Sequence, residues 1–576
     1  MKKRILGASI GNCVHVAGVV HFLNLAEQEG YETIFLGPAV SVESLFENIQ
    51  KYKPDIIGIS YRLTPENVQP LLNEIFERAE TLNYAPKWVF GGTHPVAEYA
   101  KKFSQFSFIS DGYDDINDSI RFLRGEGNLN VVDQYGTTLR ERIESSFPYP
   151  VLRHHFGLPD LEETIRGVSE IAESKVLDVI SLGPDQNAQQ FFFQPEKMEN
   201  KYNGAGGVPV RIEEDFRRLK QASKCGNYPL MRCYSGTEDV FQYAQMLLDT
   251  IDNAWTAVPL FWYSELDGRG TRPIEVSLRE AQRLIRWHAE RGIPVEVNEP
   301  HHWGLRDAHD VIPVAAAYLS AYNAKKQGVR DYVAQYMFNN PNGLSFSMDF
   351  AKILAMIEVT ESLADENFRV YRETRAGLPL FSADEAVAKG QLAASTFMQM
   401  AVKPHIVHVV GFCEADHAAS ARDVIESCKI VRGVIRHTFS ESFSMEKDER
   451  ILARKNELVS EAKVLLNFIE NRFSDYEDPL ANPDVLAECV KRGYLDAVHI
   501  VKNQKFRGNL YTRFQDGKCV AVDKATGKPL SEAERLKSLV KREKMQLGDE
   551  SHEEQVFNSG RRPSGTGHGG TFESVR

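Results

Sequence analysis

The chain has 576 residues, of which 42% are hydrophobic and 26% charged, and its formal net charge is −12. A chain of this length is too long for one hydrophobic core and predicts two to four domains of an ordinary soluble protein. The negative charge without a dense basic stretch argues against a nucleic-acid partner. Because no apolar segment approaches the roughly 20 residues that span a bilayer, we also expect no membrane partner.

The start of the chain and the cysteines predict a cytoplasmic protein. The start, MKKRILGASIG, has too short an apolar run for a signal peptide and favours a first β-strand. The cysteines include no CxxC pair, which argues against a disulfide framework or a structural zinc site and favours reduced thiols. They are Cys13, Cys225, Cys233, Cys413, Cys428, Cys489 and Cys519.

Residues 1–125 alternate short apolar runs with helix-like stretches. The runs are RILGAS, ETIFLG, DIIGIS, WVFGG and FSFIS. Five parallel strands with helices on both faces, a doubly wound, flavodoxin-like α/β domain, are expected. Ligands of such sheets bind beyond the carboxyl ends of the strands.

The alternation of short apolar runs and helix-like stretches fades after residue 125 and then returns. We interpret residues 126–174 as a linker and residues 175–480 as a (β/α)8 TIM barrel, because eight candidate strands recur there, most of them separated by amphipathic helices. The candidate strands are VLDVISLG, VPVR, YPLMRCYS, AWTAVPLFWYS, IPVEVNEP, YVAQYMFN, NFRVYRETR and HIVHVVGF. Residues 481–545 predict a small α+β appendix, and the polar, Gly/Ser-rich residues 546–576 predict a disordered tail.

Three short blocks follow three strands of the first domain. They are His15 with Gly18, Ser60 with Leu63, and the pair Gly91-Gly92. Residues 19–59 separate the first block from the second, and residues 64–90 separate the second from the third. The spacing resembles the cobalamin-binding signature D-x-H-x-x-G, a gap of about 41 residues, S-x-L, a gap of about 27 residues, and G-G.

The resemblance assigns roles to these residues. In that family the benzimidazole tail leaves cobalt and lies in a slot along the sheet, and a histidine, here His15, becomes the lower cobalt ligand. The glycines leave room for the tail, and the hydroxyl of Ser60 can hydrogen-bond a buried tail nitrogen. The family's aspartate is Cys13 here, and a thiol is a weaker partner for the second imidazole nitrogen; Asn12 or a water could substitute.

The rest of the chain resembles the large subunit of glutamate mutase, most plainly in NPDVLAECVKRGYLDAVHI and GKCVAVDKATGKPLSEAERL. No helical cap precedes the first domain, so the corrin is expected to face the barrel mouth. The resemblance implies an adenosylcobalamin-dependent radical mutase that isomerises the carbon skeleton of a small amino or dicarboxylic acid, and we expect a homodimer. A corrinoid-dependent methyltransferase and a non-catalytic cobalamin-binding protein are the alternatives.

Active residues of such barrels lie at the C-terminal ends of the strands. The resemblance assigns Arg232 to a substrate carboxylate and Glu265 to the substrate's amino group, and Arg211 is a second candidate clamp. A guanidinium suits this role because its planar fork pairs bidentately with a carboxylate. The alternative for each is a rim salt bridge that stabilises by roughly 0–1 kcal/mol.

The chain departs from that family in several places. Arg269 and Arg272 stand in the loop where the family has two tyrosines, and GPDQNAQQ replaces a first-strand arginine, so the pocket is rewired. The stretch NEPHHWG can line a substrate site or hold a metal. His408 and Glu414 fall near family positions that contact the adenosyl ribose, although core and helix-start roles are equally open.

Overall fold

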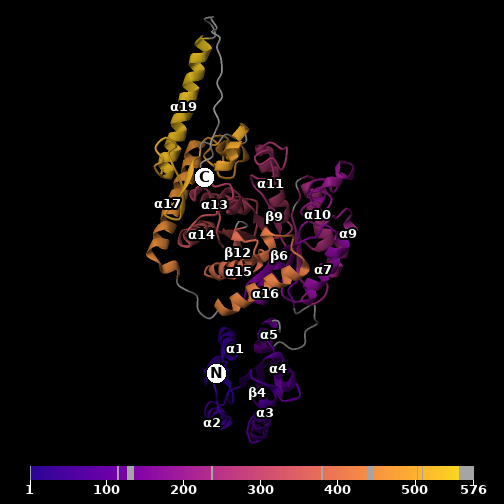
Figure 1. Cartoon of the computed structure of the whole chain (residues 1–576). Coiled ribbons are helices and arrows are strands. Elements are labelled where there is room, and N and C mark those ends of the chain that lie inside the picture. Colours follow the sequence, from indigo (N-terminus) through magenta and orange to yellow (C-terminus); the bar gives the residue numbers. More distant parts are fainter. Residues whose placement is uncertain are drawn as a thin grey trace.

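The computed structural model describes residues 2–112, 116–125, 135–234, 236, 238–377, 380–438, 445–502, 504–506, 508 and 510–556. Figure 1 shows a small N-terminal part, a larger part built around a ring of strands, and a long C-terminal helix that projects from the larger part. In this described part of the chain, no helix is long and apolar enough to cross a membrane. All seven cysteines are free thiols.

The N-terminal part contains the expected parallel sheet, in the order β2-β1-β3-β4-β5. All five predicted strands are confirmed: β1 (Arg4–Ser9), β2 (Glu32–Phe35), β3 (Ile56–Tyr61), β4 (Lys87–Gly92) and β5 (Phe106–Ser110). The helices between and after them are α1 (Ala17–Gln28), α2 (Val42–Tyr52), α3 (Pro65–Ala79), α4 (His94–Ala100) and α5 (Ile116–Arg124). The register pairs Ser9 with Ser60 and Ser60 with Gly91, so the carboxyl ends of the three central strands meet at one edge.

The second sheet is a nearly closed barrel of eight parallel strands, β6 to β13, in which β13 pairs with β6. The strands are β6 (Val151–Phe156), β7 (Val179–Leu182), β8 (Leu230–Cys233), β9 (Thr256–Val258), β10 (Val295–Val297), β11 (Asp331–Phe338), β12 (Arg369–Ala376) and β13 (Ile406–Val409). The sheet's two edges, β8 and β9, meet through a backbone hydrogen bond from Ala254 N to Met231 O (2.9 Å).

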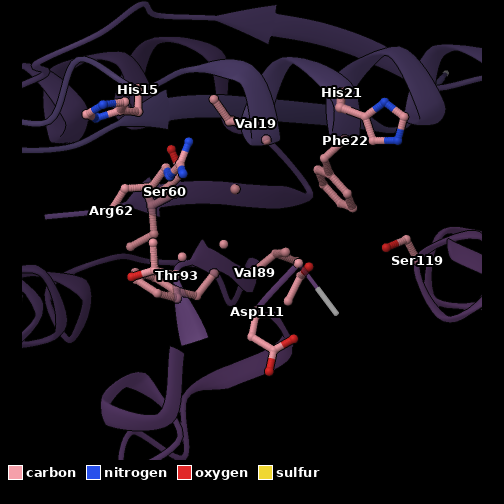
Figure 2. A pocket seen from close by; sticks show the side chains of 18 of the residues that line it. His15, Val19, His21, Phe22, Ser60, Arg62, Val89, Thr93, Asp111 and Ser119 are labelled. Carbon is pink, nitrogen blue, oxygen red and sulfur yellow. The ribbon is translucent and has the colours of Figure 1, made fainter. Parts of the chain in front are cut away.

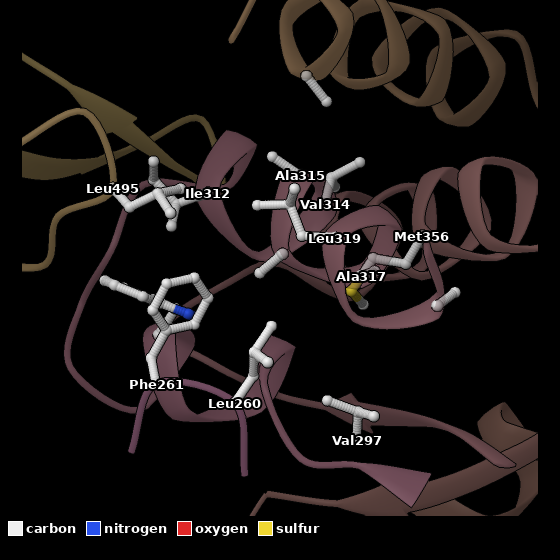
Figure 3. Close-up of a cluster of buried hydrophobic side chains, with 14 of the residues drawn as sticks. Leu260, Phe261, Val297, Ile312, Val314, Ala315, Ala317, Leu319, Met356 and Leu495 are labelled. Carbon is white, nitrogen blue, oxygen red and sulfur yellow. The ribbon is translucent and has the colours of Figure 1, made fainter. Parts of the chain in front are cut away.

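Helices surround this barrel. They are α7 (Leu161–Glu173), α8 (Gln186–Phe191), α9 (Glu213–Ala222), α10 (Val240–Ile251), α11 (Ile274–Ala289), α12 (Pro300–Gly304), α13 (Val311–Lys326), α14 (Phe346–Glu361), α15 (Glu385–Met400) and α16 (Ala421–Thr438). Helix α13 is buried along most of its length, and its small residues bring it close to α14 and to α17 (Glu449–Arg472). Figure 3 shows Ile312, Val314 and Leu319 of this helix among other apolar side chains of the core.

The structure corrects the start of the barrel. Seven predicted strands are confirmed, but residues 208–211 form no strand: Val208 makes only an isolated bridge with Pro184. The first strand is instead β6, which was predicted to be part of the linker. The three polar residues in VLRHHF interrupt the apolar run, yet Arg153 and His155 point into the barrel, where charged partners satisfy them.

The C-terminal region packs on the barrel helices. It comprises α17 (Glu449–Arg472), α18 (Pro483–Lys491), the hairpin β14 (Thr512–Gln515) and β15 (Lys518–Ala521), and α19 (Glu532–Val556). Buried ion pairs join it to the barrel, including Arg454–Asp310 (2.8 Å) and His309–Glu532 (2.9 Å). The structure differs from the predicted disordered tail over residues 546–556, which are helical; residues 557–576 lie outside the described residues.

The N-terminal domain contacts the barrel at the N-terminal end of the barrel strands. Arg124 at the end of α5 donates to Phe147 O (3.2 Å), and His21 of α1 lies 3.3 Å from the hydroxyl of Tyr149, just before β6. Helix α16 ends at the same side, since Arg432 donates to Val176 O just before β7. The sequence led us to expect contact at the opposite end, the barrel mouth, and this structure does not have that arrangement.

Candidate functional site

A cavity of about 690 Å³ lies beside α1 and α5 of the N-terminal part, and we call it the slot. Figure 2 shows His15 and Ser60 toward one end of it and His21 and Ser119 toward the other. Five of the six residues predicted from the spacing motif line it: His15, Gly18, Ser60, Gly91 and Gly92. The sixth, Leu63, follows β3 and is 40% exposed. Strand pairing therefore brings together residues that are up to 77 positions apart (92 − 15).

The lining fits a ligand that fills the slot and carries a hydrogen-bonding group. The Ser60 hydroxyl is buried and has no hydrogen-bond partner in the described part of the chain. A buried hydroxyl without a partner is costly, so a ligand atom is its natural complement. At Gly18 an added Cβ would meet nothing within 4 Å, so this glycine keeps space open in the slot. At Gly92 a Cβ would come within 2.9 Å of Tyr61 O, so only glycine fits there.

His15 stands in the exposed loop between β1 and α1, as expected for a ligand of a metal outside the sheet edge. Its Nδ1 lies 3.8 Å from the sulfur of buried Cys13, so the thiol occupies the position behind the imidazole. Asn12 does not substitute for it, because its side-chain oxygen accepts a hydrogen bond from Tyr61 (3.0 Å). The Nδ1 atom of His15 therefore has only a weak thiol partner.

The axial ligand can be identified by spectroscopy. We expect Co(II) cobalamin bound to ¹⁵N-labelled protein to show hyperfine coupling to a protein nitrogen, and His15→Ala to lose that coupling while still binding cobalamin. Electron paramagnetic resonance of both proteins measures this. Coupling to the unlabelled benzimidazole nitrogen in the labelled wild-type protein would show that His15 is not the ligand.

The barrel interior begins with an apolar layer at its N-terminal end. Val151, Val179, Leu230, Val333 and Ile406, one from each of five strands, form it. Trp255 and Tyr371 complete the layer, and Leu139 and Ile143 of α6 (Leu139–Ser146) close it from below. Because side chains alternate along a strand, the next inward layer is two residues further along each strand.

That next layer is charged. Arg153 donates to Glu373 from Nε (3.0 Å) and Nη2 (2.6 Å), and Gln335 donates to both Glu373 (3.1 Å) and Glu296 (2.5 Å). Trp255 Nε1 also donates to Glu296 (3.0 Å). Burial raises the pKa of Glu373, and the charge of Arg153 opposes the rise. Charged groups without solvent need such partners, so this layer is a connected network.

Arg232 lies in the same layer but is incompletely satisfied. It is 1% exposed, and its Nη1 lies 3.3 Å from Glu296 Oε2. None of its three guanidinium nitrogens makes a hydrogen bond with a described residue. The guanidinium also lies 4.7 Å from the centre of the Trp255 ring. Burial, and then the charge of Arg153, lower its pKa. The structure thus places the predicted clamp residue inside the barrel with donors available for a ligand.

The layer nearest the mouth adds a third cation and neutral rings. Arg375 is 9% exposed, and its Nε has no partner among the described residues. His155 Nε2 accepts from Arg153 (3.2 Å) and Tyr234 (3.0 Å). His408, in register with Arg153 of the layer below, packs edge-on against the ring of His155. Burial, and then the charge of Arg153, hold the pKa of both histidines well below the usual value, so both are neutral.

The ionisable groups of these two layers carry an excess of positive charge. Inside the barrel Arg153, Arg232 and Arg375 outnumber the buried Glu296 and Glu373, and the neutral histidines add no charge. The exposed Glu414 at the mouth is a third carboxylate whose charge acts on Arg375. A cation excess in a nearly dry site favours a bound anion. The geometry therefore suits a small ligand that carries a carboxylate.

The other predicted residues lie outside this network. Arg211 makes a bidentate ion pair with buried Asp185 (3.0 and 2.6 Å). Glu265 accepts from Ile274 N (3.0 Å) at the start of α11 and from Lys505 (2.5 Å). Glu414 is exposed on a short 3-10 helix, Phe412–Ala415, at the mouth end. Of the predicted catalytic residues, only Arg232 is brought into the barrel interior, together with His408.

The two loop arginines also have partners. Arg272 pairs with Glu280, and Arg269 lies 3.8 Å from Asp267 and over the ring of Tyr263. Asp267 in turn lies 3.7 Å from Arg306.

The stretch NEPHHWG lies at the mouth, where it follows β10. The Glu299 carboxylate accepts from the backbone N–H groups of Leu260 and Phe261 and from Trp303 Nε1. His301 and His302 are buried, and burial holds the pKa of each well below its usual value. In the described ranges, side chains close enough to share a metal occur elsewhere, at Cys413, His417 and Asp423 and at His94, Glu98 and Asp111.

Glu299 predicts a pH dependence of stability. Burial raises its pKa to about 8, so the folded state favours the protonated carboxyl, and the stability from this group is lost as pH rises from about 4.5 through 8. We expect Glu299→Gln to gain stability relative to wild type, on the order of 3 kcal/mol, between pH 5 and pH 9. Thermal unfolding of both proteins measures this difference, with exposed Glu290→Gln as control. An unchanged difference across this range would contradict the assignment.

Sequence reasoning missed Arg153, His155, Glu296, Glu373 and Arg375. Arg153 and His155 were hidden because their strand was read as linker. The signal that could have found all five is the period-2 pattern of polar residues in VLRHHF, VEV and RVYRETR, which places alternate residues on the inner face.

Comparison with protein families matches residues 3–113 to the B12 binding domain. This stretch holds all residues of the spacing motif and most of the slot. Residues 3–113 are therefore a B12-binding domain, and cobalamin binding is supported for this chain. The match covers less than a quarter of the chain and does not extend to the barrel.

The other comparisons add no functional assignment. A comparison with curated proteins finds no match. Among solved structures, a cobalamin-binding protein from Desulfitobacterium hafniense DCB-2 is 21% identical, over 21% of this chain and 57% of that one, with a TM-score of 0.19. The cobalamin-dependent S-adenosylmethionine radical enzyme OxsB is 9% identical in its apo form (82% and 67% covered, TM-score 0.17). With aqua-cobalamin bound, it is 11% identical (76% and 56%, TM-score 0.19). These scores carry no argument about the barrel.

Proposed function

We propose that this chain is an adenosylcobalamin-dependent carbon-skeleton mutase, resembling glutamate mutase, that acts on a small carboxylate-bearing acid. The observation that carries the proposal is the buried cation excess of Arg153, Arg232 and Arg375 inside a barrel joined to a B12-binding domain. A substrate carboxylate would complete this charge balance and take hydrogen bonds from Arg232.

The slot residues would hold the cofactor. His15 would bind the cobalt, Ser60 would donate to the cofactor's tail, and Gly18, Gly91 and Gly92 would leave room for that tail. When bound, adenosylcobalamin supplies a carbon-centred radical that can take a hydrogen atom from a substrate. The chain's own contribution is to orient the substrate, place charge around it and exclude water.

The two polar layers of the barrel would have different roles toward the substrate. Arg232 would anchor the carboxylate from the inner layer, and Arg375 and the neutral rings of His155 and His408 would surround the reacting carbons nearer the mouth. Glu373, whose pKa burial raises, would remain paired with Arg153 and keep that arginine away from the substrate. Water is already largely excluded from this region, because the side chains of Arg153, Arg232, Glu373 and His408 are at most 2% exposed.

The reaction would also need the B12-binding domain to move relative to the barrel. In this structure they meet at the N-terminal end of the barrel, whereas the cationic layers open toward the C-terminal end. The proposal therefore includes a movement that turns the His15 edge of the B12-binding domain toward the barrel mouth.

The test is anaerobic incubation with adenosylcobalamin and candidate acids: glutamate, 3-methylaspartate and 2-methyleneglutarate. We expect one acid to give cob(II)alamin and organic-radical signals by electron paramagnetic resonance, and a rearranged product by nuclear magnetic resonance. Turnover with methylcobalamin and a methyl donor, without radical signals, would support a methyltransferase instead. Cobalamin binding without any turnover across such a panel would favour a carrier.

A further inference from the structure

A group of side chains on the outside of the barrel wall has the composition of a metal site. Cys413 lies on the 3-10 helix that follows β13, His417 lies in the loop after it, and Asp423 lies in the first turn of α16. One sulfur, one nitrogen and one oxygen of these side chains lie within 4.8 Å of one another. A thiol, an imidazole and a carboxylate are the side-chain groups that bind zinc in proteins.

A second histidine faces the same place from the barrel wall. His154 of β6 points outward, because the residues that alternate with it point into the barrel. The Cβ that Gly411 lacks would lie 3.1 Å from His154 Nε2 and 3.3 Å from Cys413 Sγ, so both atoms border the gap beside this glycine. The charge of Asp423 also acts on His154. His154 is outside the 4.8 Å group, so a fourfold site requires its ring to move toward the other three.

The other ring nitrogen of His154 leaves Nε2 free to bind a metal. Nδ1 lies 2.5 Å from His155 O, and because a carbonyl can only accept, Nδ1 carries the proton. Burial lowers the pKa of His154 to about 4, so the ring is neutral and Nε2 keeps its lone pair. Among the described residues this buried atom has no hydrogen-bond partner, and the residue is 4% exposed. A buried lone pair without a partner is costly, and a metal ion satisfies it.

His417 is held in the way that is usual for metal-binding histidines. Its Nδ1 lies 2.8 Å from Asp416 Oδ2, a carboxylate behind the ring, and its Nε2 lies 3.2 Å from Asp423 Oδ2. Two nitrogen or oxygen ligands of one tetrahedral zinc ion are about 3.3 Å apart, so this pair already has the spacing of a shared metal. A surface ion pair would explain this contact by itself, but it would leave the buried lone pair of His154 without a partner.

The charge around the group favours a cation. Burial, and then the charge of Asp423, raise the pKa of the Cys413 thiol to about 11, and Glu414 and Asp416 add to the rise. A zinc ion would reverse this effect, because it binds the thiolate and releases the proton.

We propose that a structural zinc ion binds at this place and is held by Cys413, His417, Asp423 and His154. The proposal goes beyond the proposed reaction and does not depend on it. The absence of a CxxC pair argued against zinc in the sequence, whereas this site needs one cysteine and takes its fourth ligand from a distant strand. The ion would join β6 to the segment between β13 and α16, beside the barrel mouth.

The test measures the zinc content of the full-length, cobalamin-free protein by mass spectrometry, and the Kd for zinc by competition with a chromophoric chelator. We expect wild type to hold about one zinc ion per chain. Cys413→Ser and His417→Ala should each raise Kd about 100-fold or more, and Asp416→Asn, which removes only the group behind the ring, about 10-fold. Exposed His437→Ala on α16 and Cys225→Ser are the matched controls, and both should bind zinc like wild type.

A second readout identifies the ligands and separates lost binding from lost folding. A thiolate bound to Co²⁺ gives a charge-transfer absorption, which wild type titrated with Co²⁺ should show and Cys413→Ser should lack. With chelator present, each variant should unfold at the same temperature as wild type, and added zinc should raise the Tm of wild type alone. Wild type that binds no zinc, or Cys413→Ser, His417→Ala or His154→Gln that binds it with wild-type affinity, would overturn the proposed site.

Discussion

Replacing Arg232 with methionine is expected to lower kcat/KM about 30- to several-thousand-fold on the substrate found in the acid screen. Methionine keeps much of the bulk but removes the charged fork, and loss of one charge-assisted clamp costs roughly 2–5 kcal/mol. The position is buried, lies against Trp255, and has no hydrogen bond of its own to a described residue. Steady-state kinetics at saturating adenosylcobalamin measure the loss.

Two further variants make this result interpretable. Arg232→Met removes the nearer of two cations beside Glu296 and leaves Arg153 at 3.9 Å, so Arg232→Met/Glu296→Gln removes both charges and tests whether a buried, less compensated carboxylate causes the defect. Arg211→Met is the control, since Arg211 is already paired with Asp185. If Arg232→Met retained near-normal kcat/KM with cobalamin bound, Arg232 would not contact the substrate, and the proposed pocket would be wrong.

Gly18→Leu is expected to weaken cobalamin binding by about 100-fold or more without harming the fold. Gly18 is in the first turn of α1, and an added Cβ meets nothing within 4 Å, so a larger side chain would occupy the slot. Forcing a ligand into filled space costs about 1–3 kcal/mol or more. Leucine also favours helix more than glycine does, by somewhat less than 1 kcal/mol, so the cobalamin-free protein should be as stable or slightly more stable.

The neighbouring Ala17→Leu is the matched control. Ala17 is exposed, belongs to the same helical turn and does not line the slot, so its substitution should leave Kd unchanged. Spectroscopic titration with cobalamin gives Kd, and thermal unfolding of the free proteins gives stability. Wild-type affinity in Gly18→Leu would mean that cobalamin does not use this slot.

The cobalamin site could be predicted from the sequence because each part of it is local. His15, Ser60 and Gly91-Gly92 each come directly at or after the end of a strand, and parallel strands bring such ends to one edge. The five strands are also short, apolar and punctuated by turns, so their order along the chain determined the sheet. The exchange of aspartate for Cys13 was visible in the sequence as well, and the structure places its sulfur beside the imidazole.

The barrel interior could not be predicted in the same way. Arg153 and Glu373 form an ion pair across 220 positions, and their meeting depends on the register of eight strands and the closure of β13 on β6. Arg153 also made its strand look like a linker, because a charge inside an apolar run is favourable only where distant partners satisfy it. For the same reason the sequence could not distinguish Arg232, which keeps donors available, from Arg211, which Asp185 occupies. The sequence by itself determined the cobalamin motif and the alternation of strands and helices, since these depend on short-range pattern. Only the tertiary structure decided which charges share the barrel interior, because those contacts join residues that no local pattern relates.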